Sequence, residues 1–144
     1  MARSPNFDRE AALGQAIGLF WQKGYHGSSM KQIEQALDMR PGSIYATFGS
    51  KDGLYSEALA RYAEAGGAEM AKHMAGYDSI LDGLKDYLRK IATSCVDKDE
   101  VPSRACLIVK TLLESSNTHT GHSKQAREIL GAIEQSFSEL LEEA

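Results

Sequence analysis

The chain has 144 residues, a length that fits one domain, and its 42% hydrophobic content is sufficient for a buried core. Its formal net charge is −4, but the acidic excess is uneven: residues 1–61 hold seven Lys and Arg against six Asp and Glu, whereas residues 62–144 hold nine against fourteen. No stretch approaches the ~18 consecutive apolar residues of a membrane span, and we recognise no signal peptide. Two cysteines without a regular framework fit a reducing compartment, so we expect a cytoplasmic protein.

The first predicted helix runs from Phe7 to Lys23. Its apolar residues recur at helical intervals on one face: Leu13, Ile17, Phe20 and Trp21. Asn6 is a suitable N-cap, and Gly24 supplies the C-terminal stop. We interpret Trp21, the only tryptophan, as a core residue rather than as a ligand contact.

Residues 28–51 contain the signals of two short helices joined by a tight turn. Ser29 and Gln32 have the spacing of a capping box, in which each side chain binds a free backbone N–H at the start of a helix. The helix that follows has its apolar residues on one face: Met30, Ile33, Ala36 and Leu37. We therefore expect the first short helix to begin near Met30.

The second short helix is predicted from Pro41 to Phe48, after a turn at residues 38–40. Proline suits the first position of a helix because the N–H it lacks is not needed there. One side of this helix carries the apolar seam Ile44, Tyr45 and Phe48, and the other side is small and polar: Arg40, Gly42, Ser43, Ala46 and Thr47. Such a slim face can enter a DNA major groove about 12 Å wide, although the spacing alone also fits an ordinary αα-hairpin.

Gly49 and Ser50 end this helix and cap a longer one, which we expect from Lys51 to Met74. The pair Gly66-Gly67 in its middle costs about 1 kcal/mol per glycine relative to alanine. We expect either a kink or close packing at this pair.

Three further segments follow. Asp78 or Ser79 caps a helix over residues 80–96, whose apolar stripe is Ile80, Leu84, Tyr87, Leu88, Ile91 and Cys95. After a polar loop, residues 105–113 are apolar nearly all round, which predicts a helix buried in the middle of this half. A second loop at residues 115–123 precedes a last amphipathic helix with Ala126, Ile129, Leu130, Ile133, Phe137, Leu140 and Leu141. With no alternating β-type runs, the chain is predicted to be all-α.

The first half also carries a dense pattern of residues: Gly24-Tyr25, Ser28-Ser29, Ile33, Ala36, Arg40 to Tyr45, Phe48 and Lys51 to Leu54. This pattern resembles the N-terminal signature of the TetR family of bacterial transcriptional regulators, over about residues 7–62. The resemblance implies a helix-turn-helix DNA-binding domain in residues 1–52 and a helical ligand-binding or regulatory domain in residues 53–144. One departure is Asp38-Met39 at the turn, where many relatives have Gly-Val.

The resemblance also implies the residues that contact DNA. Matching positions predict phosphate contacts from Ser29, Tyr45, Thr47 and Lys51, and base-edge contacts from Arg40, Pro41, Gly42 and Ser43. The chemistry agrees, because an arginine can bind guanine O6 and N7 with two hydrogen bonds and a lysine is a point charge beside the groove. The Tyr45 ring could instead be core, Thr47 stands where relatives often carry histidine, and we interpret His26 as a solvated loop residue.

A small apolar or electrophilic effector is expected between the helices of the second half. Its predicted pocket is lined by Tyr62, Met70, Met74, Tyr87, Ile91, Cys95, Cys106 and Val109. Cys106 lies between Arg104 and Lys110 near a helix start, where nearby cations lower the pKa of a thiol. The sequence around Cys106 resembles the Gly-Cys-Leu motif of TetR subgroups that respond to electrophiles or oxidants. Cys106 is therefore a redox-sensing candidate, and Cys95 is a weaker candidate for its partner. The alternative is that Cys106 is a structural cysteine.

We therefore expect a homodimeric repressor that binds a palindromic double-stranded DNA operator. The alternatives are a thiol-based redox sensor that uses Cys106, and a helical interaction module that does not bind DNA. Family members continue with two further helices that form most of the dimer interface, so we expect the regulatory domain to be truncated at Ala144 or to dimerise differently. We expect no metal site, because His119 and His122 have no ligand at metal-binding spacing. We find no Ser-His-Asp order, Gly-rich phosphate loop or pair of catalytic carboxylates, so we do not expect an enzyme, and we expect no cofactor.

Overall fold

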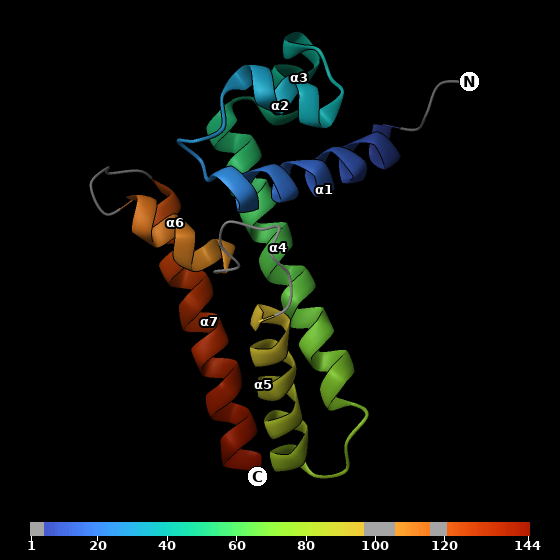
Figure 1. Ribbon diagram of the computed structural model, residues 1–144, viewed down its shortest axis with the longest axis vertical. Helices are drawn as coiled ribbons and strands as arrows, with labels where there is room; N and C mark the ends of the chain where they lie inside the picture. Colours follow the sequence, from blue (N-terminus) through green and yellow to red (C-terminus); the bar gives the residue numbers. More distant parts are fainter. Residues whose placement is uncertain (1–4, 97–105, 116–120) are drawn as a thin grey trace.

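The computed structural model describes residues 5–96, 106–115 and 121–144, and helices account for most of them (Figure 1). The helices are α1 (Pro5–Lys23), α2 (Met30–Leu37), α3 (Pro41–Phe48), α4 (Lys51–Met74), α5 (Ile80–Val96), α6 (Leu107–Ser115) and α7 (Gly121–Glu143). None of the described residues forms a strand. The all-α prediction is therefore confirmed.

The short helices begin and end where their capping residues predict. The Ser29 hydroxyl accepts a hydrogen bond from the Gln32 N–H at 3.2 Å, and the Gln32 side chain accepts one from the Ser29 N–H at 2.9 Å. Asp38 ends α2 in the left-handed region with φ +50°, and Gly49 ends α3 with φ +80°. Ser50 then caps α4 by accepting from the Gly53 N–H at 2.9 Å. These local bonds set the angles between α2, α3 and α4.

Two helix starts differ from the prediction. α1 begins at Pro5, so Asn6 lies inside its first turn and is not the N-cap; proline at a helix start is the signal that accounts for this. α7 begins at Gly121 rather than after a loop that extends to Ser123. Its first turn is helical because His122 and Ala126, four residues apart, are both buried against the rest of the protein.

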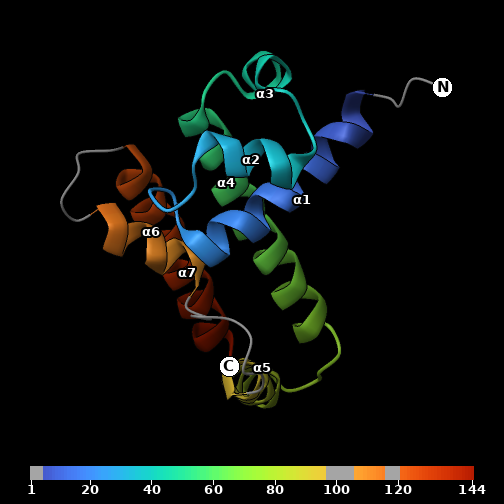
Figure 2. The same cartoon turned by 45° about the horizontal axis from the view of Figure 1, so that its top comes forward.

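Among the described residues, one cluster of buried side chains joins α1, α2, α3, α4, α6 and α7. α1 crosses α4 at the top of the molecule, and α2 and α3 lie above them (Figures 1 and 2). The cluster includes Phe20, Ile33, Ile44, Leu54, Tyr55 and Leu59, and it continues without interruption to Leu107, Ile108 and Ala126. The short helices α2 and α3 are therefore held by the same core that receives α6 and α7.

Three details of the second half correct the sequence-based expectations. α6 is buried on one side only, since Val109 is 40% exposed and Leu113 is 70% exposed. The prediction of close packing at Gly66-Gly67 is wrong for the described residues, because a Cβ on either glycine would meet none of their atoms within 4 Å. The apolar stripe of α5 is also partly exposed, with Leu88 at 56%.

The cap of α5 is Ser79 rather than Asp78: its hydroxyl accepts from the Asp82 N–H at 3.3 Å. No helix in the described parts of the chain is long and apolar enough to cross a membrane.

Candidate nucleic-acid interface

Helix α3 presents two chemically different sides. Ile44 and Phe48 are buried in the core, at 0% and 6% exposure. The remaining residues of the helix and its N-cap are exposed: Arg40, Pro41, Gly42, Ser43, Tyr45, Ala46 and Thr47. Tyr45 is 49% exposed, so its ring is not a core residue. All of the predicted base-edge residues therefore lie together on an accessible surface at the top of the molecule (Figure 1).

Two predicted phosphate contacts lie at helix starts beside α3. Ser29 is exposed at the start of α2, where its hydroxyl and N–H are bonded to Gln32. Lys51 is the first residue of α4 and is half-buried. Its ammonium lies 4.2 Å from the centre of the Tyr25 ring. Burial lowers the pKa of Lys51, while the nearby carboxylates of Asp52 and Glu114 act in the opposite direction.

Ion pairs connect α1 to α4 beside α3. A guanidinium nitrogen of Arg9 lies 2.6 Å from the Glu57 carboxylate, and the same guanidinium lies 5.2 Å from the centre of the Phe48 ring. Arg61 forms a second pair with Glu10. These pairs are partly exposed, so each adds at most about 1 kcal/mol. They orient α1 across α4 more than they stabilise the fold.

Helix α6 contacts the C-terminal end of α1 through two side chains one turn apart. The Lys110 ammonium donates to the Trp21 carbonyl at 2.5 Å, and the Glu114 carboxylate accepts from the Tyr25 N–H at 2.8 Å. Gly24 has φ +73°, and a Cβ there would lie 1.8 Å from a Glu114 oxygen. The turn between α1 and α2 therefore needs glycine for its conformation and for the approach of Glu114.

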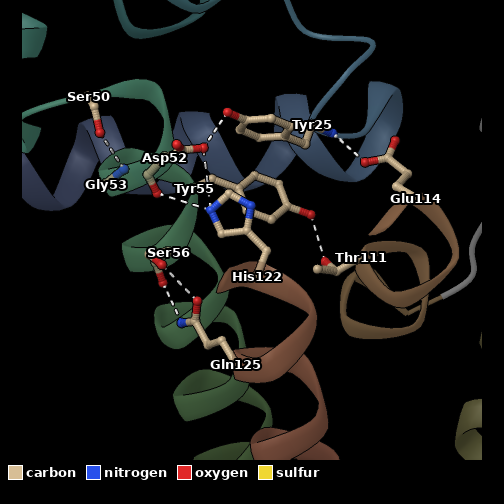
Figure 3. Close-up of polar contacts among 10 residues, drawn as sticks. All are labelled: Tyr25, Ser50, Asp52, Gly53, Tyr55, Ser56, Thr111, Glu114, His122 and Gln125. Carbon is tan, nitrogen blue, oxygen red and sulfur yellow. Dashed lines mark hydrogen bonds and ion pairs between the residues drawn. The ribbon is translucent and has the colours of Figure 1, made fainter. Parts of the chain in front are cut away.

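The first turn of α7 contacts the same turn from another direction (Figure 3). His122 is 5% exposed, and its ring centre lies 5.0 Å from that of Tyr25 and 4.7 Å from that of Tyr55. Its Nε2 lies 3.3 Å from the Asp52 carbonyl oxygen. The assignment of His122 to a loop was wrong, because it lies in the first turn of α7. The signal was present, because His122 extends the apolar stripe of Ala126 by one turn.

Hydrogen bonds join α4 to α6 and α7 below this cluster (Figure 3). The hydroxyls of Tyr55 and Thr111 are 2.6 Å apart, and Thr111 donates to the Leu107 carbonyl at 2.8 Å. Ser56 and Gln125 exchange two bonds of 2.8 Å each. An open hollow of about 630 Å³ lies between the first turns of α4 and α7, lined by Asp52, Gly53, Ser56, Gly121, His122, Lys124, Gln125 and Glu128.

The residues predicted to line an effector pocket are only partly brought together. Tyr62, Tyr87 and Cys106 are neighbours from α4, α5 and the start of α6; burial raises the pKa of Tyr62 to about 12, and its bond to Cys106 adds to the rise. Met70 and Met74 are half-buried on α4, whereas Ile91 and Val109 are 42% and 40% exposed.

Some of the predicted residues cannot be placed. Arg104, His119 and the side chain of Cys95 lie outside the described residues. Lys110, the other cation expected beside Cys106, donates to α1.

Comparison with known proteins matches residues 12–58 to the family of bacterial regulatory proteins described as the tetR family. The HTH-type transcriptional repressor ComR of Escherichia coli (strain K12) is 36% identical over 94 residues, which are 65% of this chain and 45% of ComR. The chain spans about half the length of the curated relatives it matches.

Solved structures extend the likeness to nearly the whole chain. A cysteine mutant of the TetR family transcriptional regulator CifR, complexed with 26-base-pair operator DNA, is 35% identical with a TM-score of 0.69, over 98% of this chain and 71% of CifR. The reduced form of NemR from Escherichia coli has a TM-score of 0.84 at 20% identity, over 95% of this chain and 70% of NemR, and shows the fold alone. The chain belongs to the TetR family of transcriptional regulators, which are not enzymes.

Proposed function

We propose that this protein is a cytoplasmic repressor that binds a palindromic operator as a homodimer and is released by a small apolar or electrophilic effector. The observation that carries the proposal is the two-sided α3: it is fixed in the core by Ile44 and Phe48 and exposes Arg40 to Ser43 together. A helix presented in this way can enter a major groove. The relatives ComR and BdcR are named repressors, and CifR is solved with operator DNA.

The exposed residues divide by their chemistry. Arg40, at the start of α3, has the forked guanidinium that binds guanine O6 and N7, and the small Gly42 and Ser43 allow close approach to the bases. Ser29 and Lys51 lie at the starts of the neighbouring helices α2 and α4, and Tyr45 and Thr47 lie on α3 itself. These four residues would bind phosphates, which orient the protein without reading sequence. Since residues 1–61 carry a net charge of only +1, affinity would depend on these few contacts.

Dimerisation would place two reading helices on successive half-sites about one helical turn apart. Apolar surface for such an interface exists on α5 and α7, where Leu88 is 56% exposed and Leu141 is 58% exposed. The effector would bind near Tyr62, Tyr87 and Cys106. It would act by favouring one of two arrangements of the two reading heads, each formed by helices α1 to α3 of one subunit.

The decisive experiment is footprinting of the upstream region of the protein's own gene at a stated salt concentration, with Arg40→Ala beside the wild type. Loss of the Arg40 fork should reduce discrimination at one guanine by about 1–3 kcal/mol. Lys72→Ala is a control of the same charge, because it removes one positive charge from an exposed position in the last turn of α4, outside the helices proposed for the dimer interface. Equal protection by the Arg40→Ala and wild-type chains would refute the assignment of α3 as the reading helix.

A thiol switch at Cys106 is the second candidate, favoured by its half-buried position beside the Tyr62 hydroxyl. If it operates, an electrophile such as N-ethylmaleimide should release the wild type from operator DNA and leave Cys106→Ser bound. Mass spectrometry of the same samples identifies the alkylated cysteine. Release of both chains to the same extent would exclude Cys106 as the switch.

A further inference from the structure

Tyr25 makes three contacts that converge on the edge of the reading head. Its ring lies under the Lys51 ammonium at 4.2 Å, and its hydroxyl donates to the Asp52 carboxylate. Its N–H donates to the Glu114 carboxylate of α6 at 2.8 Å. One residue in the turn between α1 and α2 therefore contacts the first two residues of α4 and helix α6 at once. Figure 3 shows its contacts with Asp52 and Glu114.

The contact with Lys51 has a physical consequence for DNA binding. A lysine has a flexible stem and loses much rotamer freedom when its ammonium binds a phosphate. A ring that already holds the ammonium reduces that loss, and affinity gained in this way comes from preorganisation. The attraction between a cation and a tyrosine ring has the strength needed for an effect of about three- to tenfold.

The position of the Tyr25 ring is itself closely determined. Its centre lies 5.1 Å from the Tyr55 ring and 5.0 Å from the His122 ring, both in edge geometry. Gly24, next to it, has φ +73° and receives the Glu114 carboxylate against its Cα. The ring under Lys51 is thus held by α4, α6 and α7 together.

We propose that Tyr25 is a positioning residue for operator binding: it holds the Lys51 ammonium in place for a phosphate, and Glu114 makes that placement dependent on α6. The inference rests on the proposed DNA-binding function. It adds a residue that affects operator binding without contacting DNA itself. It also means that the position of α6 can change the affinity for the operator. A displacement of α6 would move Tyr25 and with it the charge at the start of α4.

A double-mutant cycle tests this role. Operator affinity is measured by fluorescence anisotropy over a series of salt concentrations for the wild type, Tyr25→Leu, Lys51→Met and the double variant. We expect Tyr25→Leu to weaken binding about three- to tenfold in the wild type and less than about twofold in the Lys51→Met background. Lys51→Met should also reduce the slope of log K against log salt by about 0.9, the value for one phosphate.

Conservative variants separate positioning from folding. Tyr25→Phe keeps the ring and should retain most of the affinity, while Tyr77→Leu, at the far end of α4, should leave it unchanged. If Tyr25→Leu does not fold, Tyr25→Met gives the same comparison with a flexible side chain of similar size. In the free protein, NMR should show ring-current shifts of the Lys51 side chain that Tyr25→Phe keeps and Tyr25→Leu abolishes.

The outcomes distinguish this proposal from the one on which it rests. Absence of the ring-current shifts, an equal loss in both backgrounds, or tighter binding by Tyr25→Leu would overturn the positioning role while DNA binding stands. An unchanged affinity of Lys51→Met would overturn the phosphate contact and the positioning role together. No operator binding by the wild type would refute both proposals.

Discussion

Tyr55 and Thr111 form a buried polar pair at the centre of the junction between α4 and α6. Both are almost fully buried, and their hydroxyls are 2.6 Å apart. Thr111 also donates to the Leu107 carbonyl, so Tyr55 is the donor to Thr111. Because Tyr55 donates to Thr111 and Thr111 donates to Leu107, the loss of the Tyr55 hydroxyl and the loss of the Thr111 hydroxyl have different effects on stability.

Removal of the Tyr55 hydroxyl and removal of the Thr111 hydroxyl should lower the free energy of unfolding by different amounts. Thr111→Val leaves the Tyr55 hydroxyl buried without its acceptor and should lower the free energy of unfolding by about 1–3 kcal/mol. Tyr55→Phe leaves Thr111 bonded to Leu107 and should cost about 0.5–1.5 kcal/mol. Urea unfolding of the two variants and of the double variant measures these costs. A larger loss for Tyr55→Phe than for Thr111→Val would contradict this direction of donation.

At the scale of the elements, α4 is the longest helix among the described residues, and it packs against α1, α3, α5, α6 and α7. Its first half is buried at Leu54, Tyr55, Ala58 and Leu59 and packs on α1, α6 and α7. Its second half, from Gly66 onward, lies mostly in the open. The first half therefore depends on packing, whereas the stability of the second half depends more on helix propensity.

This difference predicts a stabilising substitution. Gly67→Ala removes the entropic cost of a glycine in a helix and adds a Cβ that meets no atom within 4 Å, so it should raise the free energy of unfolding by about 0.5–1 kcal/mol. Gly24→Ala is the matched comparison and should lower it, because φ is +73° and the Cβ would collide with Glu114. Thermal unfolding followed by circular dichroism measures both. Destabilisation by Gly67→Ala would indicate that this glycine has a packing partner outside the described residues.

At the scale of the whole molecule, segments far apart in sequence meet at one junction. Tyr25 from the first turn region, Asp52 and Tyr55 from α4, Glu114 from α6 and His122 from α7 lie in contact there (Figure 3). Helices α1 to α3 are consequently not an independent unit joined to the rest of the protein by a linker. The domain boundary expected at residue 52 falls within the first turn of α4, inside this junction.

Two tyrosines, Tyr25 at the junction and Tyr62 beside Cys106, predict how stability depends on pH. Burial, assisted by the bond to Asp52, raises the pKa of Tyr25 to about 12, and burial raises the pKa of Tyr62 to about 12. A folded-state pKa above the unfolded value of 10 means that the stabilisation is complete below pH 10 and is lost between about pH 10 and 12. The pKa of Lys51 is lowered in the folded protein, so the ionisation of Lys51 changes stability in the opposite direction. It is one group against the two tyrosines.

Urea midpoints measured across this alkaline range should therefore fall as pH rises, together with the appearance of tyrosinate absorbance. Tyr62→Phe should show a smaller fall than the wild type, because one of the two strongly shifted groups is removed. Tyr45→Phe is the control, since Tyr45 is exposed on α3. An equal fall in all three chains would assign the alkaline loss to other groups.

The sequence by itself determined the local structure: the bounds of α2 to α5 and the capping box at Ser29 follow from contacts within a few residues of each other. On α3 the sequence predicted the apolar seam correctly for Ile44 and Phe48 but not for Tyr45, which is exposed. Only the tertiary structure decided which side of α6 is buried, where α7 begins and how Tyr25, Lys51 and His122 meet. The physical reason is distance along the chain. A cap is specified by neighbours three residues apart. The periodicity of α7 signals that His122 is buried, but no periodicity connects it to its partners Tyr25 and Tyr55, which lie far away in the sequence.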